Sequence, residues 1–196
     1  MKKRDIEFLY EIGTLRNTDR AWKQHLAMKV ATDPEHCFRV AFIALLLAEA
    51  EGVKNHEKII KMALVHDLAE TRTSDFNYIQ KVYVEADEKS AARDLFAGTV
   101  FRTLFADVLH EYEERKCIEA KIVKDADNLD VDLELKELEE RGSQLRTKWR
   151  ASRRLVRDKK LYTKSAKKLW DDIQKSDVSS WHLKANKWYK IPHAGK

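Results

Sequence analysis

The stretch MALVHDLAE, residues 62–70, decides how the rest of the chain is interpreted. Such an apolar run is typical of a buried helix, yet this one ends in an imidazole and a carboxylate, His66 and Asp67. Glu70 follows one helical turn after His66. Burying these groups costs free energy unless an opposite charge or a metal ion balances them. Histidine with carboxylate suits Zn, Mn, Fe or Co, and carboxylate-rich sites favour Mn or Mg, so a metal site here requires ligands from other segments.

Helical patterns run through the whole chain. Because only five Gly and two Pro occur among 196 residues, an all-β or loop-rich fold is disfavoured. No segment shows the alternation of a half-buried strand. We therefore predict an all-α fold, with a loop over 71–77 and helices over residues 3–15, 35–51, 55–69, 78–96, 99–115 and 117–141, followed by two or three more between 144 and 190.

The helix over residues 35–51 has clear boundaries. Pro34 at a first-turn position, with Asp33 before it as a cap, predicts its start, and Gly52 predicts its end. The helix is apolar around its whole circumference, which predicts that it is buried on every side. His36, in its first turn, is therefore a polar group in a helix that should belong to the core.

Charge is divided unevenly along the chain. Residues 141–196 carry 17 Lys and Arg against 4 Asp and Glu, whereas residues 1–140 carry 21 against 29. Trp149, Trp170, Trp181 and Trp188 lie in the basic part, where we expect them to anchor helix packing. We predict one domain over 1–142 and a basic helical C-terminal extension over 143–196 that packs on it. A basic segment of this kind suits either an acidic body or nucleic acid.

No feature of the sequence indicates a membrane or secreted protein. No run of 18 apolar residues is present, and the first residues are not followed by the apolar stretch of a signal peptide. Cys37 and Cys117 lack metal-type spacing, so we expect reduced core thiols. These observations predict a cytoplasmic protein without a membrane partner.

Polar residues at four core positions form an ordered constellation: His36, then His66 and Asp67, then Asp127. The blocks around them are PEHCFRVA (34–41), HDLAE (66–70) and KDADNLD (124–130). In this order they resemble the HD-domain phosphohydrolases, over about residues 16–140. The resemblance implies a helical HD bundle that holds one divalent metal ion, Co, Mn, Mg or Zn, through these four residues. The neighbouring acids Asp125 and Asp130 are the alternatives to Asp127 as ligand.

The chemistry of these residue types agrees with the resemblance. Adjacent residues on a helix point about 100° apart, so His66 and Asp67 reach one ion only near a helix end, where the backbone opens. Two imidazole nitrogens and two carboxylate oxygens at about 2.0–2.2 Å leave positions for water and substrate. A metal ion in such a site lowers the pKa of its water and polarises a phosphoryl oxygen.

Within this superfamily the chain is most similar to the 5′-deoxynucleotidase branch, whose members are typically homodimers. The resemblance implies that Glu70 acts near the attacking water, that Asp75 lies near the sugar hydroxyl, and that Arg20 contacts phosphate beside Trp22. Arg16 is a competitor for the role of Arg20. Residues 74–77, SDFN, depart from the Gly-Asp-x-Pro pattern that is frequent in the branch, which leaves the substrate open.

The resulting hypothesis is a metal-dependent phosphomonoester hydrolase. It would release phosphate from deoxynucleoside 5′-monophosphates by attack of metal-bound water. The alternative is a non-catalytic or regulatory HD protein that binds nucleic acid or nucleotides through its basic C-terminal segment. The complete ligand set and Glu70 favour the enzyme. A two-metal phosphodiesterase needs more His ligands between His66 and Asp127, where only His110 is present.

Overall fold

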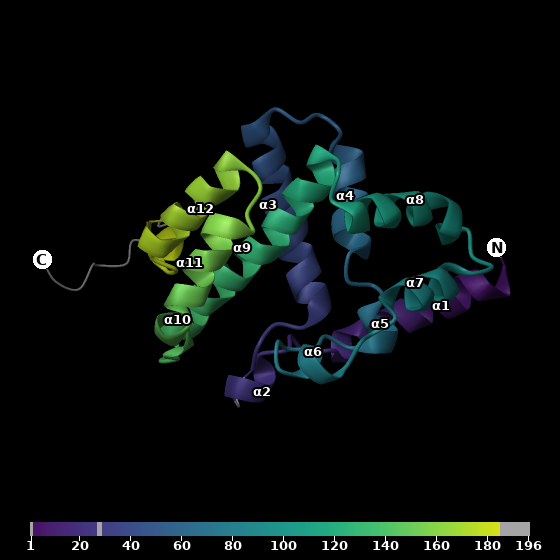
Figure 1. The fold of residues 1–196 in the computed structure, drawn as a ribbon, viewed down its shortest axis with the longest axis horizontal. Helices are drawn as coiled ribbons and strands as arrows, with labels where there is room; N and C mark the ends of the chain where they lie inside the picture. Colours follow the sequence, from purple (N-terminus) through teal and green to yellow (C-terminus); the bar gives the residue numbers. More distant parts are fainter. Residues whose placement is uncertain (1, 27–28, 185–196) are drawn as a thin grey trace, which may run out of the picture.

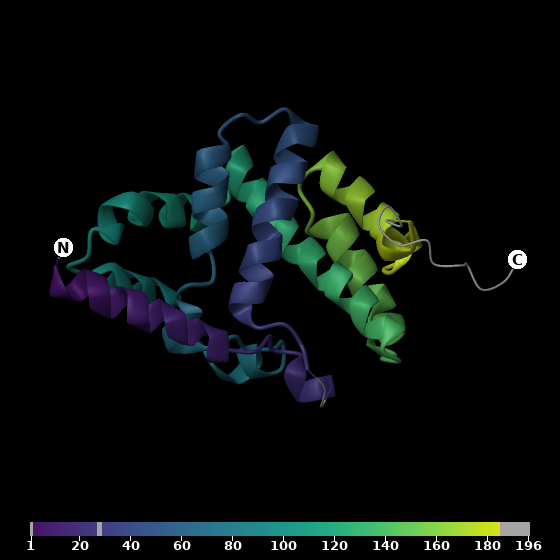
Figure 2. The same cartoon turned by 180° about the vertical axis from the view of Figure 1, so that it is seen from behind.

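The computed structural model describes residues 2–26 and 29–184 (Figures 1 and 2). These residues form helices and no β-strand, with one isolated bridge between Asp19 and Thr32. The predicted all-α class is therefore confirmed. None of these helices is long and apolar enough to cross a membrane. The elements are α1 Lys3–Gly13, the 3₁₀ helix η1 Thr14–Asn17, α2 Lys23–Leu26, α3 Asp33–Glu51, α4 His56–Val65, α5 Glu70–Thr73, α6 Gln80–Tyr83, α7 Glu88–Phe96, α8 Phe101–Glu114, α9 Ile118–Glu140, α10 Leu145–Lys148, α11 Arg150–Lys159, α12 Lys164–Lys175 and α13 Ser180–Lys184.

The core is built around α9, which packs against α3, α4, α8 and α12 (Figures 1 and 2). Each fully buried aliphatic side chain at these contacts contributes about 1.5–3 kcal/mol. Such burial is what fixes the relative positions of the three segments that carry the constellation. The buried side chains include Val40, Ala44 and Leu47 of α3, Ile59 and Met62 of α4, Ile122, Ala126 and Leu129 of α9, and Trp170 and Ile173 of α12.

The start of α3 differs from the sequence prediction by one residue. Thr32, not Asp33, is the N-cap, and it forms a capping box in which its backbone N–H donates to Glu35 Oε2 at 2.7 Å. Asp33 is the first helical residue and its side chain is fully buried. The helix start is thus stabilised by the capping box of Thr32 and Glu35, and the Asp33 carboxylate is available to face the interior.

The prediction that α3 is buried on every side is wrong. Phe38, Phe42 and Leu46 are 69%, 61% and 57% exposed. Their spacing of four residues places them on one face of the helix, while Val40 and Ala44 point into the core. The uniform apolarity of α3 therefore reflects a buried face and a second, exposed apolar face.

The segment after His66 is more broken than its sequence pattern predicts. Helix α4 ends at Val65, and part of the expected loop over 71–77 is helical as α5. The expected helix over 78–96 is interrupted, because Val84 adopts an extended backbone and Asp87 starts α7 by accepting a hydrogen bond from the backbone N–H of Ser90 at 2.9 Å. Local capping here outweighs the helical periodicity.

The basic C-terminal helices are tied to α9 by buried polar contacts. Asp125 accepts hydrogen bonds from the backbone N–H groups of Tyr162 and Thr163 at 2.7 and 2.8 Å, and from Thr163 Oγ1 at 2.7 Å. Trp170 is 6% exposed and belongs to the core, whereas Trp181 is 70% exposed. Trp170 therefore packs in the core as expected for this segment, whereas the exposed Trp181 does not. Trp188 lies outside the described residues.

Replacing Asp125 with alanine should destabilise the protein. Three donors around residues 162–163 would lose their acceptor in a buried environment, so we expect the free energy of unfolding to fall by about 3 kcal/mol. Urea denaturation followed by circular dichroism measures this. The matched control is Asp172→Ala, whose exposed ion pair with Lys168 should cost at most about 1 kcal/mol. Equal effects of the two substitutions would contradict the anchoring role of Asp125.

Candidate metal centre and substrate cavity

Three helices bring the predicted metal ligands together. His36 lies in the first turn of α3, His66 and Asp67 form the turn after α4, and Asp127 lies in the middle of α9. His36 Nε2 is 3.4 Å from His66 Nε2 and 3.5 Å from Asp67 Oδ2. His66 Nε2 is 3.2 Å from Asp67 Oδ2, and His36 Nε2 is 3.3 Å from Asp127 Oδ1. The donor atoms of His36, His66 and Asp67 thus lie within 4.8 Å of one another, and Asp127 approaches this group at His36 without belonging to it.

The spacing of these donor atoms fits a single transition-metal ion. Ligands about 2.0–2.2 Å from a shared ion lie about 3.0–3.5 Å from one another in octahedral or tetrahedral geometry. The three separations among His36, His66 and Asp67, 3.2–3.5 Å, fall in this range, and so does the 3.3 Å between Asp127 and His36. His66 and Asp67 achieve it because α4 ends at Val65, so their backbone is not held to helical side-chain directions.

The outer nitrogens of both imidazoles are held in place. His66 Nδ1 lies 2.9 Å from the carbonyl oxygen of Ala63, which accepts its proton and leaves the lone pair of Nε2 free. His36 Nδ1 lies 2.6 Å from Asp130 Oδ2, and Arg39 in turn donates to Asp130. Such outer contacts fix the ring orientation and raise the basicity of a metal-binding histidine.

The three acids of the 124–130 block therefore have different surroundings. Asp127 faces the Nε2 atom of His36, and Asp130 faces its Nδ1 atom on the opposite side of the ring. Asp125 points to residues 162–163 instead. This arrangement favours Asp127 over its two neighbours as the metal ligand.

The electrostatics of the cluster favour a cation. Burial opposes protonation of the imidazoles, but Asp67 outweighs it and raises the pKa of His66 well above its ordinary value, and Asp127 and Asp130 raise the pKa of His36. Conversely, His66 holds the pKa of Asp67 below its usual range despite burial. A metal ion would therefore compete with protons for the imidazole nitrogens.

Metal affinity should consequently depend on pH. Raised pKa values keep the imidazoles protonated above the pH at which free histidine has lost its proton, and a metal must displace these protons. Apparent affinity should rise from about pH 6 to about pH 8, by up to about tenfold per pH unit for each proton released. Titration calorimetry with Mn²⁺ in buffers of different ionisation enthalpy counts those protons. An affinity independent of pH would contradict this ligand set.

Arg20 lies at the centre of the carboxylates beside the donor atoms. Its Nη1 is 3.4 Å from Asp33 Oδ1, 3.3 Å from Asp67 Oδ2 and 3.4 Å from Asp75 Oδ2. Its guanidinium also lies 4.9 Å from the ring centroid of Trp22, whose Nε1 donates to Glu134 Oε2 at 3.0 Å. Arg20 is therefore a buried counter-charge at the site, held on one side by the indole.

Arg16 and His110 lie away from this site. Arg16 is exposed on η1, where its Nε donates to the carbonyl oxygen of Gly13 at 2.5 Å. His110 is exposed on α8. Of the two arginines that the sequence left in competition, the structure brings only Arg20 to the carboxylates.

Glu70 is a buried acid of the site whose carboxyl has an unpartnered oxygen. It begins α5, is 9% exposed, and its Oε2 has no hydrogen-bond partner among the described residues. Burial and the neighbouring carboxylates of Asp67 and Asp75 raise the pKa of Glu70 far above its ordinary value, and a cation in the metal site would lower it. A buried carboxyl group with a free oxygen beside the metal donors is suited to proton exchange with water.

Asp75 has a different environment. Its Oδ2 accepts a hydrogen bond from the backbone N–H of Ala21 at 2.9 Å and faces Arg20. These contacts connect the loop after α5 to the segment that carries Arg20 and Trp22. Asp75 therefore both shapes the site and lines its cavity.

The donor atoms open into a cavity of about 610 Å³. This volume lies within the range of about 300–1,000 Å³ that small-molecule sites have. All of the predicted site residues except His36 line it. The lining also contains residues that the sequence analysis missed, among them Tyr112, Arg115, Lys124, Leu145, Trp149 and Ser152.

Two of the missed residues are cations in the cavity lining, Lys124 and Arg115. Lys124 Nζ donates to Asp127 Oδ2 at 2.5 Å, and its position three residues before Asp127 was a signal for a shared helix face. Arg115 ends α8 with a left-handed backbone, φ 54°, and its guanidinium lies 3.3 Å from the ring centroid of Tyr112. Its Nη1 has no hydrogen-bond partner among the described residues. No sequence pattern indicated Arg115.

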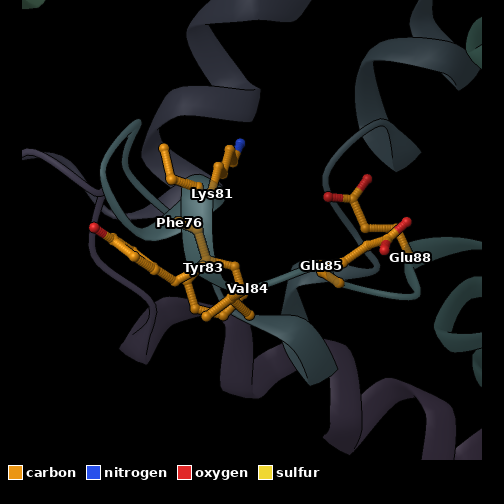
Figure 3. A pocket seen from close by; sticks show the side chains of 8 residues that line it. Phe76, Lys81, Tyr83, Val84, Glu85 and Glu88 are labelled. Carbon is orange, nitrogen blue, oxygen red and sulfur yellow. The ribbon is translucent and has the colours of Figure 1, made fainter.

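A second hollow of about 560 Å³ lies beside the cavity (Figure 3). It shares Phe76, Lys81 and Glu88 with the cavity lining. Figure 3 shows Lys81 on the far side of this hollow from Glu85 and Glu88. The segment between α5 and α7 is thus a rim with one side toward the metal donors and the other toward this hollow.

A helical bundle with His, His-Asp and Asp at one point defines the HD class of metal proteins, and residues 12–170 match the family model of the HD domain. The chain belongs to the HD domain family, as its three sequence blocks predict. It is 34% identical over 156 residues to the 5′-deoxynucleotidase HDDC2 of Dictyostelium discoideum, covering 73% of this chain and 82% of that protein. The chain is also 30% identical over 149 residues to the 5′-deoxynucleotidase HDDC2 of Xenopus laevis, covering 71% of this chain and 73% of that protein.

Solved structures support the same fold. A conserved hypothetical protein from Pyrococcus furiosus superimposes with a TM-score of 0.72 at 24% identity, covering 87% of this chain and 99% of that one. The three segments that carry the metal donors therefore belong to a known helical architecture.

Proposed function

We propose that the protein is a metal-dependent phosphomonoester hydrolase that releases phosphate from deoxynucleoside 5′-monophosphates. The observation that carries this proposal is the donor group beside a cavity of about 610 Å³: the nitrogen and oxygen donors of His36, His66 and Asp67 lie 3.2–3.5 Å from one another, and Asp127 lies 3.3 Å from His36. The relatives that carry the name 5′-deoxynucleotidase support the choice of nucleotides as substrates. The protein is thus a hydrolase of the HD family.

His36, His66, Asp67 and Asp127 would hold one divalent ion. Their mixture of imidazole and carboxylate suits Co, Mn or Zn, with Mg as a harder alternative. When bound, such an ion lowers the pKa of water and stabilises the charge that develops on the phosphoryl oxygens. The second group of carboxylates, around Arg20, already has a counter-charge, so we assign the ion to the first group alone.

Glu70 accepts the proton of the attacking water, because its carboxyl is buried beside the donors and has a free oxygen. Asp75 accepts a hydrogen bond from the sugar hydroxyl. Arg20, with Trp22 beside it, balances charge at the carboxylate side of the site. Because Arg20 contacts three carboxylates, Lys124 and Arg115 are the cations better placed to meet the phosphate dianion.

A phosphate-release screen tests the proposed function. The panel contains 5′-mononucleotides in deoxy and ribo forms, each with Co²⁺, Mn²⁺ and Mg²⁺, and an EDTA control. We expect metal-dependent release from deoxynucleotides in preference to ribonucleotides. Release confined to ribonucleotides or to non-nucleotide phosphates would overturn the substrate assignment, and absence of release from every substrate would overturn the enzyme.

The alternative of a regulatory protein that binds nucleic acid has weaker support. Several cations of the basic segment are neutralised within the protein, because Arg146 pairs with Glu139, Arg153 with Asp132 and Arg157 with Asp171. Tight binding of DNA or RNA with a steep salt dependence would favour this alternative.

We further propose the assembly and location that the family branch suggests. The HD domain over 1–142 and the described part of the basic extension, residues 143–184, form one folding unit, because Asp125 and the core around Trp170 join them, and the remainder of the predicted extension lies outside the described residues. The free thiols of Cys37 and Cys117 suit the reducing cytoplasm. Two copies associate through the exposed face of α3, which carries Phe38, Phe42 and Leu46.

Replacing Phe42 with aspartate tests the proposed dimer. A charge in the centre of an apolar interface should shift the protein from dimer to monomer, which light scattering after size exclusion measures. Leu155→Asp is the control, because Leu155 is also exposed but lies on α11. A wild-type monomer, or a dimer unaffected by Phe42→Asp, would contradict this interface.

A further inference from the structure

Residues of the C-terminal segment line one side of the cavity at a regular spacing along the chain. Leu145 of α10, Trp149 between α10 and α11, and Ser152 and Val156 of α11 all line it. Their spacing of four, three and four residues corresponds to one helical face. The lining is therefore a continuous wall contributed by residues outside the segments that carry the metal donors.

Buried polar contacts fix this wall relative to the metal centre. Arg153, on α11, donates from Nη2 to Asp132 Oδ2 at 2.7 Å and to the carbonyl oxygen of Asn128 at 2.7 Å. Asn128 is the residue after Asp127 on α9. Because Arg153 is itself buried, it acts as a positioning residue that holds the wall at a set place beside the donor atoms.

The two parts of the cavity differ in chemistry. The donor side carries carboxylates and the cations Lys124 and Arg115. The wall offers an indole, two aliphatic side chains and a hydroxyl, and its one cation, Arg153, is already paired with Asp132. A molecule with a dianionic end and a planar, weakly polar end matches this division. Aromatic side chains bind nucleobases by stacking, and this binding tolerates different bases because every base has a π-face.

We propose that Leu145, Trp149, Ser152 and Val156 form the nucleobase subsite of this hydrolase, with Trp149 as the stacking surface. This inference rests on the proposed function, because it assigns the base of the same mononucleotide substrate. It gives residues 145–156 of the basic segment a direct role in substrate selection. A wall of this kind selects for the presence and size of a base.

The first test removes the stacking surface. Trp149→Ala and wild type are compared on deoxyguanosine 5′-monophosphate and on 2-deoxyribose 5-phosphate, which has the same phosphate and sugar without a base. We expect the ratio of kcat/KM for the nucleotide to that for the sugar phosphate to fall about tenfold, mainly through KM, since base stacking contributes about 1–3 kcal/mol. An unchanged ratio overturns the subsite.

The second test fills the subsite without shortening a buried side chain. Ser152 is exposed and faces the cavity, and its neighbour Ala151 is exposed and does not line it. Ser152→Trp should lower the same ratio at least about tenfold, while the matched control Ala151→Trp should leave it within about twofold. Equal effects of the two tryptophans overturn the subsite, even if Trp149→Ala fails to fold.

Failure of the proposed function is distinguishable from failure of the subsite. Wild-type protein that releases phosphate from neither compound contradicts the hydrolase assignment. Calorimetric binding of deoxyguanosine 5′-monophosphate to wild type and to Ser152→Trp then decides the subsite. Binding that is about tenfold weaker in the variant supports it, and equal binding or no binding overturns it.

Discussion

Replacing His66 with alanine, or Asp67 with asparagine, is expected to remove the metal ion and lower phosphate release at least about 10³-fold. A metal ion supplies several kcal/mol of transition-state stabilisation, and each 1.36 kcal/mol corresponds to about tenfold in rate. His66 and Asp67 supply two of the three donor atoms that lie within 4.8 Å of one another. Elemental analysis after dialysis measures the metal, and a phosphate assay measures turnover.

The matched control for the His66 and Asp67 substitutions is His110→Ala. His110 is exposed on α8 and should leave both metal content and turnover close to wild type. Circular dichroism establishes that the His66 and Asp67 variants remain helical. Wild-type metal content in folded His66→Ala would show that His66 is not a ligand.

Replacing Glu70 with glutamine should lower turnover by about 10²–10⁴-fold while the metal ion stays bound, because proton transfer by a positioned side chain contributes this much. Glutamine has nearly the same shape but cannot accept the proton. The effect should fall on kcat more than on KM, since Glu70 acts on water and not on the substrate. Phosphate release and metal content are measured on the same sample.

Glu88→Gln is the control for Glu70. Glu88 lines the same cavity but lies on the rim at α7, away from the metal donors. We expect its turnover to stay within about threefold of wild type. If Glu70→Gln retains wild-type turnover, the assignment of Glu70 as the proton acceptor is wrong.

The sequence was most informative where buried polar groups interrupt an apolar pattern. His36 and His66 each stand out beside an apolar run, and the need for His66 and Asp67 to lie near a helix end is met by the end of α4 at Val65. These features depend on helical periodicity and burial, which a sequence records directly.

The sequence could narrow the choice of metal ligand among Asp125, Asp127 and Asp130, but the structure was needed to complete it. Asp125 and Asp127 lie about 200° apart on a helix, so only one of them can face His36. Asp127 and Asp130 lie on neighbouring faces, and the ring of His36 fits between them. Their separate roles follow from the position of that ring, which the sequence does not define.

Contacts between segments that are distant in the sequence could not be predicted from its patterns. Arg115 reaches the cavity through a left-handed backbone at the end of α8 and by stacking on Tyr112. Trp149 has the pattern of a packing residue, and its place on the cavity wall depends on how Arg153 joins α11 to α9. Neither arrangement leaves a periodic signal in the chain.

The central claim is that His36, His66, Asp67 and Asp127 hold one divalent ion that phosphate release requires. The most direct measurement is a titration of the EDTA-treated protein with Mn²⁺, in which bound metal and release of phosphate from deoxyguanosine 5′-monophosphate are followed together. We predict saturation at one ion per chain, with activity rising in proportion to occupancy. Full activity of the metal-free protein, or saturation at two ions, would contradict this account.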